Sequence, residues 1–175
     1  MKSETVKTDV PDDHLLMLTR HITAVQGYVE LGMFMDANAE LEEIDPDLRA
    51  APEVLAVRLG IYSGLKKWEL MQVVAKSLVN HDPDEVQWSI SLAYATRRDE
   101  SIEAAKVILL EAVERHPKEP MLHYNLACYE CQLGDVEVAK ARLQHALKLE
   151  PRMRLMALED EDLKAVWNSL ATDPE

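Results

Sequence analysis

Glycine, cysteine, phenylalanine and basic residues are all scarce in this chain of 175 residues, which has five glycines, two cysteines and one phenylalanine. The shortage of glycine, beside abundant Ala, Leu, Glu and Lys, favours helices over a fold that is rich in tight turns. Nineteen basic residues against 32 acidic ones give a formal net charge of −13. Such a surface repels phosphate backbones, and no basic stripe offsets it, so the composition argues against nucleic-acid binding.

Long apolar runs are also missing. No stretch approaches the length of a membrane span, and the opening residues, MKSETVKTDVPDD, lack the apolar core of a signal peptide. We therefore expect a cytoplasmic protein with reduced cysteines and no membrane partner. Residues 1–12 are polar and aperiodic, which predicts a flexible N-terminal tail, and the length of the rest fits a single domain over 13–172.

A period of 34 residues runs through the chain. Pro83, Pro117 and Pro151 are each separated by 34 residues. Small or apolar residues follow the same spacing in three series, which are Ala37, Met71, Ala105 and Ala139, then Leu41, Ala75, Leu109 and Leu143, then Ile44, Leu78, Ala112 and Ala146. Each period contains two amphipathic helical patterns joined by a short turn, which is typical of a solenoid of helical hairpins.

The last period, residues 121–151, resembles a tetratricopeptide repeat (TPR). Leu126-Ala127 is similar to the Leu-Gly pair of the family's first helix, and Gly134-Asp135 is similar to its turn. The second helix matches through Ala139, Leu143, Ala146 and the closing Pro151. His123 and Glu130 stand where the family has Trp and Tyr. The resemblance extends over four units at about 14–45, 52–83, 85–117 and 119–151, and it implies an all-α, right-handed superhelical solenoid.

A further amphipathic segment follows the fourth unit. Asp160 or Asp162 is expected to open a capping helix over about 160–171, with Leu163, Val166, Trp167 and Leu170 on one face. Such a helix covers the apolar end of a solenoid. Trp167 is therefore interpreted as a capping residue and not as a ligand contact.

Cys128 and Cys131 form the sharpest chemical motif, a C-x-x-C. Redox activity would need this motif at a strand–helix junction, and zinc would need about four ligands, whereas here the pair lies inside a helical pattern with scattered histidines. The thiols are thus interpreted as packing or groove-lining groups, with a metal or redox role as the minor alternative. No nucleophile elbow, phosphate loop or paired-histidine metal motif is present, so we expect no enzyme, no cofactor and no metal site.

The resemblance implies a concave groove lined by the first helix of each hairpin. Carried onto this chain, its inner-face pattern selects Val57, Ile61, Ile90, Tyr94, Arg97, Arg98, Met121, Tyr124, Cys128, Cys131 and Gln132. Aromatic residues and arginine are over-represented at binding hot spots, and an arginine orients a carboxylate through paired hydrogen bonds. The alternative for Arg97 and Arg98 is that they pair with Asp99 or Glu100.

These patterns predict a non-catalytic scaffold that binds a peptide or helix of a partner protein in its groove. Two alternatives remain open within the same fold. One is a self-assembling structural protein that forms a homodimer through the apolar wall or the end near Trp167. The other is a TPR-type chaperone for secreted proteins, which the small size, acidity and repeat number allow.

Overall fold

The computed structural model describes residues 13–167, which form nine α-helices and two short 3-10 helices, with no strand in that range. The all-α architecture predicted from the sequence is confirmed. The tail predicted for residues 1–12 and the end of the capping helix, including Leu170, lie outside the described residues. The chain divides into two compact units, residues 1–65 and 66–175.

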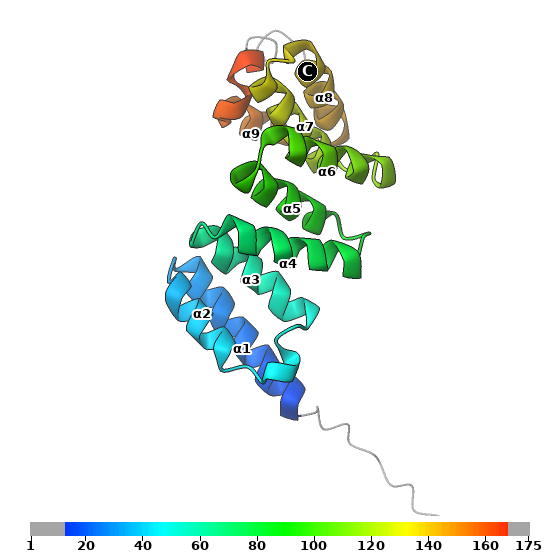
Figure 1. Cartoon of the computed structure of the whole chain (residues 1–175). Helices are drawn as coiled ribbons and strands as arrows, with labels where there is room; N and C mark the ends of the chain where they lie inside the picture. Colours follow the sequence, from blue (N-terminus) through cyan, green and yellow to red (C-terminus); the bar gives the residue numbers. More distant parts are fainter. Residues whose placement is uncertain (1–12, 168–175) are drawn as a thin grey trace, which may run out of the picture. The chain divides into compact units, whose positions relative to one another are not determined.

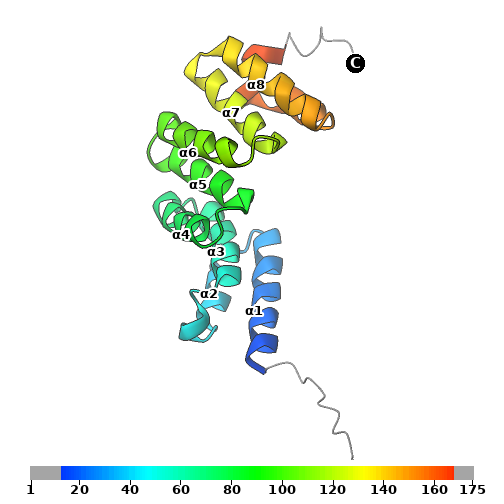
Figure 2. The same ribbon diagram turned by 90° about the vertical axis from the view of Figure 1, so that its right-hand side faces the viewer.

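The first unit is a helical hairpin followed by a third helix. Its elements are α1 (Asp13–Glu30), α2 (Phe34–Glu42), the 3-10 helix η1 (Pro46–Leu48) and α3 (Pro52–Gly64). Helix α1 packs against both α2 and α3 (Figure 2). The core of the first unit consists of Leu18, Val25, Ala37, Leu41, Ile44, Val54 and Ile61. Gly60 lets α3 approach α1 closely, because a Cβ there would lie 3.3 Å from Cγ1 of Val29.

The second unit continues the helical pattern in consecutive neighbours. Its elements are α4 (Trp68–His81), α5 (Val86–Asp99), α6 (Ile102–Arg115), α7 (Pro120–Leu133), α8 (Val136–Leu149), α9 (Met153–Glu159) and the 3-10 helix η2 (Glu161–Val166). Each helix from α4 to α8 packs against the next one along the chain (Figure 1). Among these neighbours, α5 with α6 and α7 with α8 are the third and fourth hairpins that the 34-residue period predicts.

The three series of repeated residues are buried in both units. Their exposed fractions are between 0% and 5% for Ala37, Leu41, Ile44, Met71, Ala75, Leu78, Ala105, Leu109, Ala112, Ala139, Leu143 and Ala146. In the hairpins α1–α2, α5–α6 and α7–α8, members of a series recur because each second helix contributes the same stripe to the core of its unit. Small side chains in that stripe let the two helices of a hairpin approach closely.

The turns between helices keep the same period in their backbone. Gly32 and Gly134 adopt positive φ angles of 71° and 89°, and Lys66, which is 34 residues after Gly32, adopts a φ of 54°. After α7 this conformation lets the N–H of Asp135 reach the carbonyl of Glu130 at 2.9 Å. Such a left-handed residue satisfies carbonyls that the helix end leaves free. Ser101 caps the start of α6, because its hydroxyl oxygen accepts a hydrogen bond from the N–H of Ala104 at 3.1 Å.

The segment after α8 covers the end of the second unit. Asp160 caps η2, since its Oδ1 accepts from the N–H of Asp162 at 3.0 Å. The cap forms as a 3-10 helix over residues 161–166, and three residues per turn place Leu163 and Val166 on one face, where both are 0% exposed. Trp167 is half-buried and its indole N–H donates to the carbonyl of Ala157 at 2.9 Å.

Candidate partner-binding surface

The predicted groove residues divide between the two compact units. In the first unit, Val57 is half-buried beside an open cavity of about 400 Å³, which is lined by Gln26, Val29, Glu30, Ala56, Val57 and Gly60. Ile61 is 0% exposed and belongs to the core of that unit, so it lines no surface. The other nine predicted residues lie in the second unit.

An aromatic cluster capped by an arginine forms the open part of the surface, on α5 and the first residue of α4. The rings of Trp68 and Tyr94 lie 5.8 Å apart in an edge-to-face arrangement. The guanidinium of Arg98 lies 4.9 Å from the Tyr94 ring centre and 5.7 Å from that of Trp68. Ile90 is half-buried one turn before Tyr94, while Arg98 is exposed. We call Trp68, Ile90, Tyr94 and Arg98 the α5 cluster.

Arg97 faces a different environment from its neighbour Arg98. Its Nη1 lies 2.5 Å from Oδ2 of Asp162, and its guanidinium lies 5.3 Å from the centre of the Tyr129 ring. The hydrogen bond to Asp162 raises the pKa of Arg97, and burial opposes that shift. Among the described residues, neither arginine forms an ion pair with Asp99 or Glu100, so that alternative is wrong.

The C-terminal segment covers the face of α7 that was expected to line the groove. Tyr124, Cys128 and Cys131 are 4%, 4% and 9% exposed. The Tyr124 hydroxyl donates to Oδ2 of Asp160 at 2.9 Å, and Sγ of Cys128 lies 3.6 Å from the same oxygen. These three side chains therefore do not line an open groove in this structure. Met121 is half-buried against the core, and the exposed Gln132 contacts the C-terminal segment at the rim.

Burial also determines the chemistry of the two thiols. Desolvation raises the pKa of Cys128 and of Cys131, and the carboxylates of Asp160 and Asp162 add to the effect. A reactive thiol needs the opposite shift. Within residues 13–167, no three His, Cys, Asp or Glu side chains are grouped so that they could hold a metal ion. The geometry thus supports the interpretation of Cys128 and Cys131 as packing groups.

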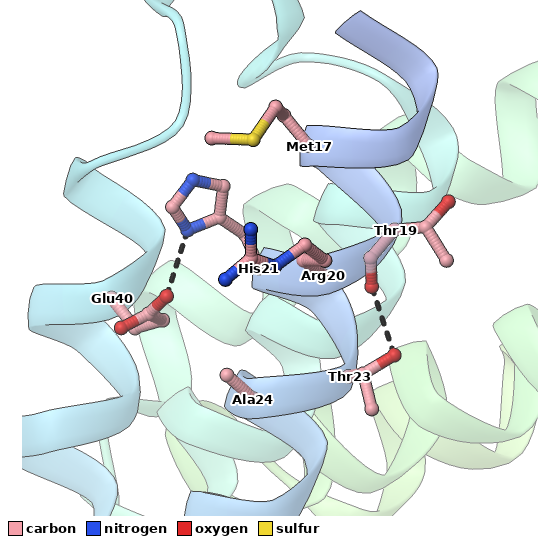
Figure 3. A pocket seen from close by; sticks show the side chains of 7 residues that line it. All are labelled: Met17, Thr19, Arg20, His21, Thr23, Ala24 and Glu40. Atoms are coloured by element: carbon pink, nitrogen blue, oxygen red, sulfur yellow. Dashed lines mark hydrogen bonds and ion pairs between the residues drawn. The ribbon is translucent and has the colours of Figure 1, made fainter. Parts of the chain in front are cut away.

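A second cavity, of about 450 Å³, lies beside α1 and α2 in the first unit (Figure 3). His21 and Glu40 face each other there, with Nδ1 of His21 2.7 Å from Oε1 of Glu40. The hydroxyls of Thr19 and Thr23 donate to the carbonyls of Leu15 and Thr19. Because these groups satisfy one another, they do not converge on a ligand or a reacting atom.

Three residues of the surface were not selected from the sequence. Trp68 is not among the predicted groove residues, and Asp160 and Asp162 are predicted only as openers of the capping helix. The sequence does contain a signal for the two aspartates. Arg97, in the third hairpin, is expected to bind a carboxylate, and the acidic capping segment is expected to cover the fourth hairpin next to it. Trp68 had no such signal, since its contact with Tyr94 depends on how α4 packs against α5.

No helix within the described part of the chain combines the length and the apolar character that crossing a membrane requires.

No protein-family model and no curated protein sequence matches the chain. Solved structures do match. MamA 41-end from Desulfovibrio magneticus RS-1 has a TM-score of 0.65 and 16% identity, over 89% of this chain and 92% of that chain. MamA MSR-1 has a TM-score of 0.63 and 21% identity, over 83% and 81%. An RS-1 MamA double mutant has a TM-score of 0.65 and 17% identity, over 76% and 75%. At such identities the likeness concerns the fold.

Proposed function

From a fold of the tetratricopeptide-repeat type, which it shares with MamA, we propose that this protein is a non-catalytic scaffold that binds a segment of a partner protein. The observation that carries the proposal is the α5 cluster. In a chain with a net charge of −13, Arg98 is exposed, lies against two aromatic rings and forms no ion pair with a described carboxylate. Tyr, Trp and Arg are the residue types that dominate binding hot spots.

The α5 cluster suits a partner segment that combines an apolar side chain with a carboxylate. The edge-to-face pair of Trp68 and Tyr94 offers rigid apolar area that loses little conformational freedom on binding. The rings hold the guanidinium of Arg98, whose planar fork can donate two parallel hydrogen bonds to a carboxylate. Ile90 extends the apolar area by one helical turn.

The reducing, cytoplasmic setting belongs to the same proposal. Cys128 and Cys131 are free, buried thiols, which suits a reducing compartment. A TPR-type chaperone for secreted proteins remains one form that the scaffold can take.

The test uses the double variant Tyr94→Ala/Arg98→Ala as bait in an affinity pull-down, with bound proteins identified by mass spectrometry. Arg115→Ala is the matched control, because Arg115 is an exposed arginine at the end of α6, outside the cluster. We expect the double variant to capture at least tenfold less partner than the native chain, whereas the control captures as much as the native chain. Capture that survives the double substitution, with a cooperative thermal melt, contradicts the proposal.

A homodimer is the second candidate, and the surface of α9 favours it. Leu155, Met156 and Leu158 are 74%, 41% and 42% exposed on a helix of seven residues. Apolar side chains gathered in this way often mark an interface. Sedimentation across a dilution series tests this candidate, and Leu155→Glu should convert a dimer into a monomer. A native chain that stays monomeric at all concentrations contradicts it.

A further inference from the structure

The contact between α7 and the C-terminal segment has donors on one side and acceptors on the other. Tyr124 Oη and Cys128 Sγ lie 2.9 Å and 3.6 Å from Oδ2 of Asp160. Arg97 Nη1 lies 2.5 Å from Oδ2 of Asp162, and Gln132 Nε2 donates to the backbone carbonyl of Asp162 at 3.3 Å. The receiving surface on α5 and α7 therefore recognises two carboxylates that are two residues apart.

An apolar anchor follows the carboxylates. Leu163 and Val166 are 0% exposed, and η2 packs on α7, next to α9 and close to α8 (Figure 1). The occupant is thus an Asp-x-Asp-Leu segment with a second aliphatic residue one 3-10 turn later. Short acidic and aliphatic segments of this kind are recognised on other proteins by paired hydrogen bonds and a buried anchor.

The polar half of this contact is open to competition from solvent. The side chains of Arg97 and Asp162 are 18% and 31% exposed, so water and a competing carboxylate can reach their ion pair. A cover that served only to shield α7 would not need a pair of charges at its edge, because apolar packing of the same volume is often as stable. Such charges instead select which segment occupies the site.

We propose that this face of α7 is a docking site for an acidic and aliphatic segment of a partner protein, and that residues 160–166 occupy it in cis as a competing ligand. The partner segment carries two carboxylates two residues apart, followed by an aliphatic side chain. This inference rests on the proposed function, because its ligand is a protein segment. It concerns a different surface from the α5 cluster.

The test measures binding of a fluorescent peptide with the sequence of residues 157–168, ALEDEDLKAVWN, to the full chain by anisotropy at low salt. In the variant Asp160→Asn/Asp162→Asn the segment in cis loses its carboxylates and keeps Leu163 and Val166. We expect this variant to bind the peptide at least tenfold more tightly than the native chain does. Adding Arg97→Gln to the variant should remove the gain.

Two controls distinguish recognition by specific residues from nonspecific electrostatic repulsion between the chain and the peptide. The matched variant Glu159→Gln/Glu161→Gln removes the same charge from exposed carboxylates that form no hydrogen bond or ion pair with α7, and it should bind the peptide like the native chain. A peptide that carries asparagine at both aspartate positions should bind the first variant at least tenfold more weakly than the original peptide. Circular dichroism verifies folding, and Asp162→Asn alone replaces the double substitution if the latter unfolds.

Equal affinity of the native chain and the Asp160→Asn/Asp162→Asn variant overturns the proposal, and so does binding that ignores the peptide carboxylates. Either result leaves the α5 cluster untouched, because the pull-down with Tyr94→Ala/Arg98→Ala tests that surface separately. Conversely, a failed pull-down does not change the expected result with the peptide.

Discussion

The carboxylate of Glu130 on α7 lies 2.7 Å from the ammonium group of Lys106 on α6, and the Glu130 side chain is only 4% exposed. This ion pair links two consecutive helices of the second unit. Glu130 occupies the place where the resemblance expects a tyrosine, so an ionic contact replaces aromatic packing there. A carboxylate this deeply buried depends on its partner, because removal of one member leaves an uncompensated charge.

Lys106→Met should therefore destabilise the protein by about 3 kcal/mol, at the low end for a buried pair because Lys106 itself is 25% exposed. Urea denaturation at pH 7 measures the free energy of unfolding. The control Lys140→Met breaks a pair whose partner, Glu137, is 85% exposed, and it should cost about 0.5 kcal/mol or less. The double variant Lys106→Met/Glu130→Met should recover most of the loss. A single variant as stable as the native chain contradicts a stabilising role for Lys106.

His123 on α7 should make stability depend on pH. It is 6% exposed, its Nε2 lies 2.8 Å from the carbonyl of Pro117, and its Nδ1 has no hydrogen-bond partner among the described residues. Desolvation lowers its pKa below 6.5. The unfolded chain then binds a proton near pH 6.5 that the folded chain does not, so stability falls as the pH drops below this value.

The variant His123→Phe tests this linkage, because phenylalanine cannot titrate. Free energies of unfolding at pH 7.5 and 5.5 should differ less in the variant than in the native chain. The comparison between the two pH values cancels any constant cost of the lost hydrogen bond to Pro117. The same pH dependence in both proteins would assign it to other groups.

Lys66 adopts a φ of 54°, which lies in the left-handed region. The equivalent positions of the period that also have a positive φ are glycines, Gly32 and Gly134. A side chain in this conformation costs about 1 kcal/mol, so Lys66→Gly should stabilise the protein by about 0.5–1 kcal/mol. Thermal unfolding followed by circular dichroism measures the gain. Lys67→Gly is the control, since Lys67 has a φ of −89°, and it should give no gain. A lower melting temperature for Lys66→Gly would refute the assignment of strain.

Gly64 should tolerate no side chain, because a Cβ there would lie 2.2 Å from Cε1 of Phe34. Gly64→Ala must displace the ring and should destabilise the protein by about 1–3 kcal/mol. Gly27→Ala is the matched control within α1, since its Cβ would meet nothing within 4 Å, and it should stabilise the helix by about 0.5–1 kcal/mol. Chemical denaturation measures the free energy of unfolding of both variants. If the two substitutions change it with the same sign, Phe34 does not restrict the side chain at position 64.

Local patterns predicted most of the fold, because a hairpin needs only its own periodicity and turn. The buried stripe from Ala105 to Ala112 and the turn at Gly134 both follow from residues close in sequence. The surface was harder to predict, since Tyr124, Cys128 and Cys131 were expected to be open and are covered by residues 160–166. Their burial depends on contacts such as Arg97 with Asp162, which are 65 residues apart and leave no periodic signal.

The order of synthesis gives the C-terminal cover a further consequence. A ribosome releases α7 and α8 before residues 160–166, so the nascent chain exposes Tyr124 and Cys128 until the segment that contacts them has emerged. Translation at about 5–20 residues per second makes that interval on the order of seconds. A message truncated before codon 160 would make the exposure permanent, and its product should be a preferred substrate for chaperones and proteases.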